Sequence, residues 1–254
     1  MHIAPRPASS YSLIVFDLDG TLTKSKQPID QETTDLLIQL LGKKRVAIIS
    51  GAGFPQFNIQ ILKNLPASSP SFTNLTLLPT SGTKFYSWRG VWNEVYAEHL
   101  APKEKERILS TLKLAINQTG VMPNGAIYGD LIEDRGSQIT YSGLGQSAPL
   151  DLKSAWDPTR EKREKIADVI RPKIPEYDIR IGGATSIDIT RRGINKAFGI
   201  RKLEEYLKIP AEQILFVGDA LFQGGNDFPA KATGVDCVQV DGPEETKMLI
   251  KSQI

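Results

Sequence analysis

Two aspartates separated by one residue stand where a short apolar run ends. In the stretch SLIVFDLDGTLTKS, Asp17 and Asp19 follow the run Leu13–Phe16, and Gly20 comes directly after them. Two carboxylates at the end of a buried strand can hold a divalent cation, which would let a phosphate approach Asp17. The Asp17 carboxylate would then attack phosphorus, and Asp19 would act as general acid and later activate water. Gly20 would let the chain turn tightly, so that the amides after it, beginning at Thr21, can donate to phosphoryl oxygens.

Two further apolar runs end in polar residues. Ser50 and Gly51 follow RVAII, and Asp219 follows ILFVG. Ligands of parallel α/β sheets bind beyond the carboxyl ends of the strands. We therefore expect Asp17, Ser50 and Asp219 to meet at that edge, although they are far apart in the sequence. Each of them is also compatible with a simple capping or turn role, and it is their combination that favours a catalytic site.

Alternating strands and helices must position these residues. Segment 30–44 has the Asp30 cap and the apolar stripe of a helix, and it lies between two apolar runs. This order predicts a parallel strand pair with a crossover helix. Segments 194–209, 213–220 and 235–242 continue with a helix and two strands. The fold class is therefore α/β, with a Rossmann-like core built on a parallel sheet.

The middle of the chain has a different pattern. Two amphipathic helices and two segments that alternate like paired strands are expected, at 101–120, 157–174, 130–145 and 177–191. The charged run at 160–165 is expected to be a solvated helix face. This pattern predicts an inserted α+β domain at 98–186, with the core domain formed by 1–97 and 187–254.

The quoted motifs resemble those of the haloacid dehalogenase (HAD) superfamily of phosphotransferases. DLDGT is similar to the first motif, and Ser50 in AIISG, Lys196 in GINKAFGIRKL and the stretch FVGDALFQGGND match the other three in order. The resemblance implies that Asp17 is the nucleophile and Asp19 the general acid/base. It also implies that Ser50 and Lys196 orient and neutralise the phosphoryl group, with Thr21 and Gly51 beside the substrate.

The same resemblance implies a metal site. Asp17, the backbone carbonyl of Asp19 and Asp219 would hold the ion, with Asn226 and Asp227 as ligands or as neighbours of the ligands. Mg²⁺ prefers oxygen ligands, and a sequence with only two histidines and one cysteine offers few others. We therefore expect Mg²⁺ as the cofactor.

The insertion between the second and third motifs has the position of the C2-type cap of class IIB. The stretches GDALFQGGNDFPA, EDRGSQITYS and GGATSIDI resemble eukaryotic-type phosphomannomutases of that class. The resemblance implies that Arg135 grips the distal phosphate and that Ser186 and Asp188 contact the substrate. The mutase cap carries further arginines in an FRNG and an IGR stretch, whereas this chain has TYSGLGQSAPLD there, without arginine.

The absence of these arginines bears on the expected reaction. A mutase must hold a bisphosphate with cations at both ends, whereas a phosphatase needs one phosphate site and a water. We therefore predict a Mg²⁺-dependent phosphatase of a small phosphorylated metabolite, such as a sugar phosphate, that works through an aspartyl phosphate. The alternatives are a phosphomannomutase, or another hexose-phosphate mutase, and a non-catalytic phosphosugar-binding protein. A binding protein has no use for a nucleophile beside an acid/base.

Composition limits the expected partners. The net charge of +2 over 254 residues gives no reason to expect nucleic acid or a membrane, and no apolar run is long enough to span a bilayer. The stretch MHIAPRPASSYS lacks the apolar core of a secretory signal. The single cysteine excludes an internal disulfide and fits a reducing compartment. We expect a cytoplasmic monomer or homodimer whose partner is a small phosphorylated substrate.

Overall fold

The computed structural model describes residues 7–66, 70–122 and 125–254, which divide into two compact units. The first unit is the described part of Met1–Ala97 together with Asn195–Ile254, and the second is Glu98–Ile194. We predicted that the inserted domain ends at residue 186, and this boundary is wrong. The strand β9 (Ser186–Arg191) belongs to the second unit, because it pairs there with two other strands.

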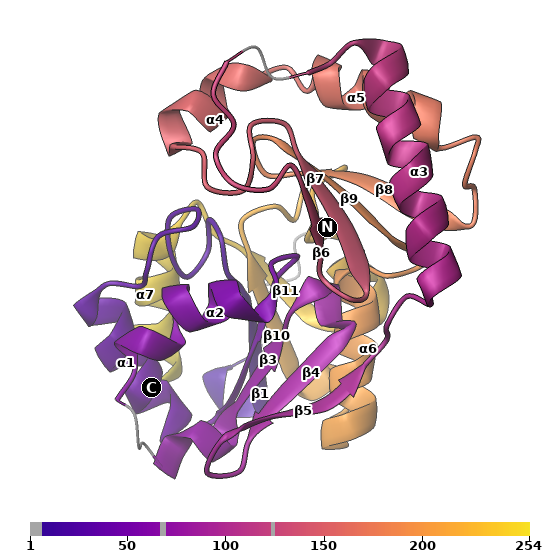
Figure 1. The fold of residues 1–254 in the computed structure, drawn as a ribbon. Helices are drawn as coiled ribbons and strands as arrows, with labels where there is room; N and C mark the ends of the chain where they lie inside the picture. Colours follow the sequence, from indigo (N-terminus) through magenta and orange to yellow (C-terminus); the bar gives the residue numbers. More distant parts are fainter. Residues whose placement is uncertain (1–6, 67–69, 123–124) are drawn as a thin grey trace. The chain divides into compact units, whose positions relative to one another are not determined.

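A seven-stranded sheet forms the centre of the first unit, with the order β11-β10-β1-β2-β3-β4-β5 (Figure 1). The parallel strands are β1 (Leu13–Asp17), β2 (Arg45–Ile49), β3 (Leu75–Leu78), β10 (Ile214–Gly218) and β11 (Asp236–Gln239). The strands β4 (Lys84–Trp88) and β5 (Trp92–Ala97) add an antiparallel pair at one edge. The predicted α/β fold is confirmed, but the β4–β5 pair was not predicted from the sequence.

Both faces of this sheet are covered. The helices are α1 (Gln31–Leu41), α2 (Phe54–Gln60), α6 (Lys196–Leu207) and α7 (Pro243–Gln253). Along β1, Ile14 and Phe16 belong to an apolar cluster with α1, α2 and α7, whereas Leu13 and Val15 belong to a second cluster with α6. A strand that is buried on both faces reads as a continuous apolar run, which is why β1 lacks polar alternation.

The second unit is an antiparallel sheet with helices on one face. Its strands, in the order β6-β7-β9-β8, are β6 (Ile132–Asp134), β7 (Gln138–Ser142), β8 (Tyr177–Gly182) and β9, and its helices are α3 (Pro102–Thr119), α4 (Leu150–Trp156) and α5 (Glu161–Ile170). Apolar residues of β7 and β9, such as Tyr141 and Ile187, pack in one cluster with α3 and α5. The alternate residues of these strands, such as Thr140 and Asp188, therefore lie on the opposite, polar face.

The charged run at 160–165 is not simply a solvated helix face, because Arg163 is only 2% exposed. Its Nε lies 2.8 Å from Oδ2 of Asp157, which is equally buried. Its Nη1 donates to the carbonyl oxygens of Gly182 and Gly183 at 3.1 and 2.8 Å. A buried charge must be paired and hydrogen-bonded, and here the pairing fixes the turn between β8 and β9 to α5.

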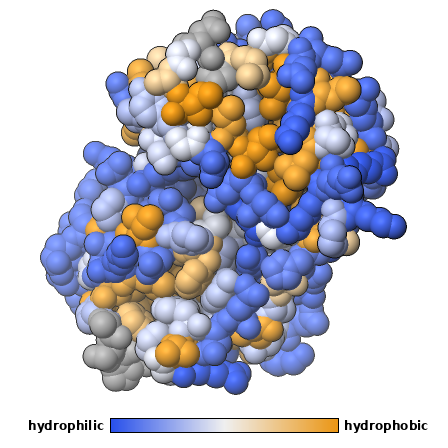
Figure 2. Space-filling view, in the orientation of Figure 1, coloured by the Kyte–Doolittle hydropathy of each residue, from blue (hydrophilic) through white to orange (hydrophobic). Residues whose placement is uncertain are grey.

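The surface view in Figure 2 shows polar side chains over most of the visible face, with hydrophobic side chains gathered on part of the second unit. Large apolar residues exposed on that unit include Leu114, Met122, Ile127, Leu150 and Leu152. Scattered apolar side chains are common on folded proteins and do not by themselves indicate a partner. Among the described residues, no helix combines the length and the apolarity needed to cross a bilayer.

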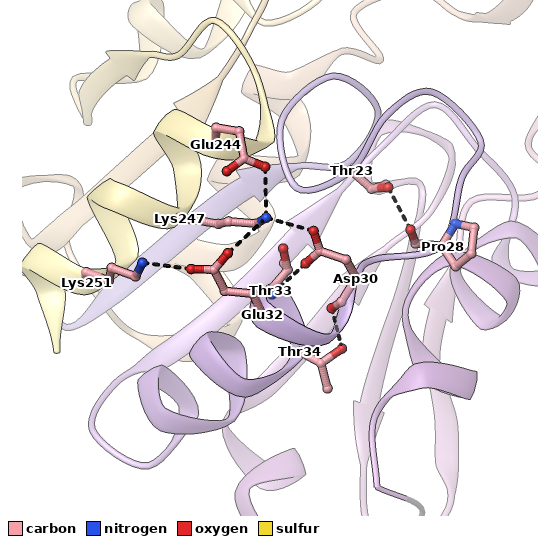
Figure 3. Close-up of polar contacts among 9 residues, drawn as sticks. All are labelled: Thr23, Pro28, Asp30, Glu32, Thr33, Thr34, Glu244, Lys247 and Lys251. Carbon is pink, nitrogen blue, oxygen red and sulfur yellow. Dashed lines mark hydrogen bonds and ion pairs between the residues drawn. The ribbon is translucent and has the colours of Figure 1, made fainter.

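The helix α7 is tied to the start of α1 by Lys247 and Lys251 (Figure 3). Lys247, whose side chain is 6% exposed, lies 2.7 Å from Asp30, 3.2 Å from Glu32 and 2.8 Å from Glu244. Asp30 also caps α1, because its Oδ1 accepts a hydrogen bond from the backbone N–H of Thr33 at 2.8 Å. The hydrogen bond from Lys247, followed by that from Thr33, lowers the pKa of Asp30 to about 2.

Replacement of Asp30 separates its two roles. Asp30→Ala removes cap and charge and should lower the free energy of unfolding by about 0.5–2 kcal/mol. Asp30→Asn keeps a capping oxygen and should cost less, about 0.2–1 kcal/mol, because Asp30 is more than half exposed and its ion pair is screened.

The stabilising effect of the Asp30 charge decreases as the pH falls. Because the folded-state pKa of Asp30 is depressed, its charge stabilises the native state above the unfolded-state pKa of about 4 and loses this effect as pH falls toward 2. Urea unfolding of wild type and Asp30→Asn should therefore differ most at pH 7 and converge below pH about 4. A difference that grows on acidification would contradict this account.

Candidate active site

The carboxyl ends of three parallel strands bring several predicted residues to one edge of the first unit's sheet. Asp17 is the last residue of β1, and it is in register with Ile49, the residue before Ser50. On the other side of β1, Phe16 is in register with Val217, so Asp219 lies just beyond the end of β10. The parallel register therefore places a carboxylate, a hydroxyl and a second carboxylate at neighbouring strand ends.

Lys196 brings a positive charge to this edge. It is the first residue of α6, whose N-cap Asn195 accepts a hydrogen bond from the first turn at 3.1 Å. The Lys196 side chain is only 2% exposed, and its Nζ contacts a carboxylate oxygen of Asp17. It also lies 2.9 Å from Oδ1 of Asp227 and donates to the carbonyl oxygen of Ile49 at 3.1 Å. One lysine therefore joins the predicted nucleophile to a second carboxylate.

A close backbone approach lets α6 reach this position. A Cβ atom on Gly82 would lie only 2.4 Å from the Cα of Gly199 in α6, and Gly82 has a φ of +87°. Only glycine combines this conformation with the lack of a side chain. The contact seats the first turns of α6, and with them Lys196, against the turn that follows β3.

Three carboxylates converge beside the lysine. Asp17, Asp219 and Asp227 each offer one oxygen, and these three oxygens lie within 4.8 Å of one another. Asp219 accepts a hydrogen bond from the hydroxyl of Thr21 at 3.3 Å. Gly20 makes room for it: with a φ of +92°, a Cβ on Gly20 would lie 2.6 Å from Oδ2 of Asp219. The turn after β1 thus packs directly against the carboxylate that follows β10.

Burial, and then neighbouring carboxylates, raise the pKa values of two aspartates at this site. Burial raises the pKa of Asp17 to about 7; Lys196 opposes this rise, and the nearby Asp227 adds to it. Burial, followed by Asp227, also raises the pKa of Asp219. Burial alone would lower the pKa of Lys196, but the carboxylates of Asp17 and Asp227 raise it above its ordinary value. One ammonium therefore faces three carboxylates, and this oxygen-only set fits a hard divalent cation such as Mg²⁺.

Two other predicted metal ligands, Asp19 and Asn226, are not among the three converging carboxylates. The side chain of Asp19 is held by the backbone N–H of Lys26 at 2.6 Å and by Nε2 of Gln60 at 3.0 Å, both at Oδ1. The side chain of Asn226 is exposed. Ligation by the Asp19 carbonyl and by Asn226 therefore stays a prediction.

The predicted phosphoryl-binding residues lie in the turns after β1 and β2. Thr21 and Ser50 are both buried. The Ser50 hydroxyl oxygen accepts a hydrogen bond from the backbone N–H of Ala52 at 3.1 Å, and the Ser50 carbonyl accepts one from Ser81 at 2.8 Å. Gly51 follows in the same turn. Their contact with a phosphoryl group stays a prediction.

Arg135 lies in the second unit and is held by a carboxylate. Its Nε and Nη2 donate to Oε2 of Glu133 at 2.9 and 2.7 Å, and its side chain is 11% exposed. Arg180, on β8 of the same unit, lies 2.7 Å from Oδ2 of Asp178. Both arginines therefore carry a carboxylate partner of their own.

Asp188 and Ser186 lie on β9 of the second unit. Oδ1 of Asp188 accepts hydrogen bonds from Nε2 of Gln138 at 2.8 Å and from the hydroxyl of Thr140 at 2.7 Å. The hydroxyl oxygens of Ser186 and Ser142 lie 3.2 Å apart. These contacts form a connected polar network on one face of the sheet, and substrate binding by Ser186 and Asp188 stays a prediction.

A family model described as eukaryotic phosphomannomutase matches residues 98–254, which is more than half of the chain. The chain belongs to the eukaryotic phosphomannomutase family. The predicted membership of the HAD superfamily is thereby confirmed. A probable phosphomannomutase of Caenorhabditis elegans is 27% identical over 259 residues, covering 97% of this chain and 96% of the relative. The phosphomannomutase of Saccharomyces cerevisiae is 24% identical over 229 residues, covering 85% and 84%.

Solved structures share the fold. A truncated Plasmodium falciparum IMP-nucleotidase superposes with a TM-score of 0.70 at 19% identity, covering 97% of this chain and 71% of that chain. A haloacid dehalogenase-like hydrolase from Bacteroides thetaiotaomicron gives a TM-score of 0.62 at 15% identity, covering 96% and 100%. At these identities the likeness shows the fold alone, which is that of a HAD-like α/β protein.

Binding of a divalent cation to the three carboxylates should stabilise the native state. At about a hundred times its Kd, Mg²⁺ would contribute about 2.7 kcal/mol, or an increase in Tm of about 5–10 °C. Asp219→Asn should remove most of this increase, whereas Asp241→Asn, an exposed carboxylate of the same unit, should leave it intact. Thermal unfolding with and without Mg²⁺ tests this. An unchanged increase in Asp219→Asn would place the cation elsewhere.

Proposed function

We propose that this protein is a Mg²⁺-dependent phosphotransferase that interconverts hexose 1- and 6-phosphates, as a phosphomannomutase does. The observation that carries the proposal is the buried contact of Lys196 with Asp17 beside Asp219 and Asp227, in a chain of the phosphomannomutase family. From the sequence we preferred a phosphatase. The relatives named phosphomannomutase support the mutase better.

In the proposed reaction, a carboxylate oxygen of Asp17 attacks phosphorus, and the bond from phosphorus to the sugar oxygen breaks. The departing oxygen takes a proton from Asp19, which leaves an aspartyl phosphate and a free hydroxyl. In the return step, Asp19 removes the proton from the accepting hydroxyl, whose oxygen attacks phosphorus and frees Asp17. Lys196 keeps one positive charge against Asp17 throughout. The further contacts of Lys196 with Asp227 and the Ile49 carbonyl fix its ammonium against the Asp17 carboxylate.

Mg²⁺ is the proposed cofactor, held by the carboxylates of Asp17, Asp219 and Asp227. When bound, it would supply positive charge against the phosphate and these carboxylates. The excess of negative charge in the buried site supports this assignment. The proposed partner is a hexose phosphate, and neither nucleic acid nor a membrane is proposed. The cytoplasmic location and the monomeric or dimeric state stay predictions.

Phosphate hydrolysis is the second candidate, and the second unit's arginines favour it. Arg135, which the family resemblance assigns to the distal phosphate, is paired with Glu133, and Arg180 is paired with Asp178. Segment 140–151 contains no arginine. Tight binding of a bisphosphate needs cations that are not already neutralised. Hydrolysis would need only the Asp17 site and a water in place of the second hydroxyl.

A parallel assay separates the candidates. With mannose 1-phosphate and a catalytic amount of hexose bisphosphate, we expect formation of mannose 6-phosphate to exceed release of inorganic phosphate. Omission of the bisphosphate should slow the conversion, because the bisphosphate would be the donor that phosphorylates Asp17. Release of phosphate without isomer would support the phosphatase. The absence of both products across a panel of hexose phosphates would favour a binding protein.

Removal of the nucleophile tests the covalent step. Asp17→Asn should lower kcat by on the order of 10⁴ or more, because an amide does not attack phosphorus. The fold should persist, since the amide has nearly the same shape as the carboxylate, and circular dichroism checks this. Asp241→Asn is the matched control and should keep wild-type turnover. Near-normal turnover by Asp17→Asn would rule out the aspartyl phosphate.

A further inference from the structure

Gln60 is a buried polar residue with an unusual set of contacts. It is the last residue of α2 and is 0% exposed; Phe57, one helical turn earlier, and Ile61, the next residue, are also fully buried. Its Nε2 donates to Oδ1 of Asp19 at 3.0 Å and to the carbonyl oxygen of Gln27 at 3.2 Å. Its Oε1 finds no hydrogen-bond partner among the described residues. Because burial of an unpaired polar atom costs free energy, packing alone does not account for an amide here.

The contact with Asp19 is specific to one oxygen. Both donors, Nε2 of Gln60 and the backbone N–H of Lys26, reach Oδ1. In the described part of the chain no hydrogen bond to Oδ2 is found, so Oδ2 is the oxygen left for proton transfer. Two donors on one oxygen fix the rotation of a carboxylate, which a single donor would not. The side chain is thus oriented from two directions.

Gln60 also holds the loop that supplies the second donor. Its backbone carbonyl accepts a hydrogen bond from the N–H of Ile29 at 2.9 Å. The Thr23 hydroxyl closes the same loop by donating to the carbonyl oxygen of Gln27 at 2.9 Å. It also donates to that of Pro28 at 3.1 Å, the contact drawn in Figure 3. Gln60 therefore connects α2, the loop at 24–29 and the Asp19 carboxylate.

We propose that Gln60 is a positioning residue for Asp19, one that holds Oδ1 so that Oδ2 meets the oxygen of the sugar. This inference rests on the proposed role of Asp19 as general acid and base. Efficient proton transfer requires the acid within hydrogen-bond reach of its partner. A third group that orients the acid/base commonly supplies that geometry.

The test uses leaving groups that differ in their need for a proton. A hexose phosphate releases an alkoxide-like oxygen that must be protonated, whereas p-nitrophenyl phosphate releases a stable anion. We expect Gln60→Met to lower kcat/KM about 10- to 100-fold for the hexose phosphate, a part of the 10²–10⁴ that general acid catalysis supplies. For p-nitrophenyl phosphate the loss should stay below about threefold. Gln56→Met, in the same helix, is the matched control and should leave both values unchanged.

Two further variants complete the test. Gln60→Leu removes the same donor with a branched side chain of similar size, so it should show the same selective loss even if Gln60→Met folds poorly. Asp19→Asn should show a larger selective loss, and addition of Gln60→Met to it should cause no further loss, because both act on one step.

The outcomes separate the two proposals. Equal losses for both substrates, no loss, or a gain in kcat/KM in the Gln60 variants would overturn the role of Gln60, provided Asp19→Asn remains selective. A non-selective Asp19→Asn would instead overturn the acid/base role of Asp19, and with it this inference.

Discussion

The first unit depends on one buried ion cluster, in which the ammonium of Lys196 lies among the carboxylates of Asp17 and Asp227. Charges taken out of water are costly unless they are paired at close range. The cluster therefore constrains every element that supplies a member: β1 must end at Asp17, α6 must begin at Lys196, and the chain after β10 must return to the site. The close approach of Gly82 and Gly199 meets that constraint.

The segment after β1 is restrained along its whole length. Near its start, Gly20 packs against Asp219, the residue that follows β10. In its middle, the Lys26 amide and Gln60 converge on Asp19, and at its end Asp30 binds Lys247 of α7. These partners come from widely separated parts of the chain. The sequence DLDGT thus supplies the two carboxylates of Asp17 and Asp19, while their orientation is set by residues outside the motif.

Much of the first unit could be predicted from the sequence because its signals are local. Apolar runs predict the buried strands, Asp30 and the leucine spacing predict α1, and the motif order predicts which strand ends carry polar residues. Other features depend on pairing between distant residues, which no local pattern contains. Gln60 shows no signal among its neighbours, and Arg163 looks like any residue of a charged run. The end of the second unit was misplaced because β9 carries both a family motif and a sheet pairing.

The insertion of the second unit between two parts of the first has a consequence for biosynthesis. β1 leaves the ribosome before residues 98–194, whereas its neighbour β10 and the partner lysine of Asp17 follow only after those residues have been made. Until then β1 has an unpaired edge, and its terminal carboxylate lacks its counter-ion. The second unit, whose strands and helices come from one continuous segment, can complete its own core first. The first unit is thus completed after the second, although its central strand β1 is made before the second unit.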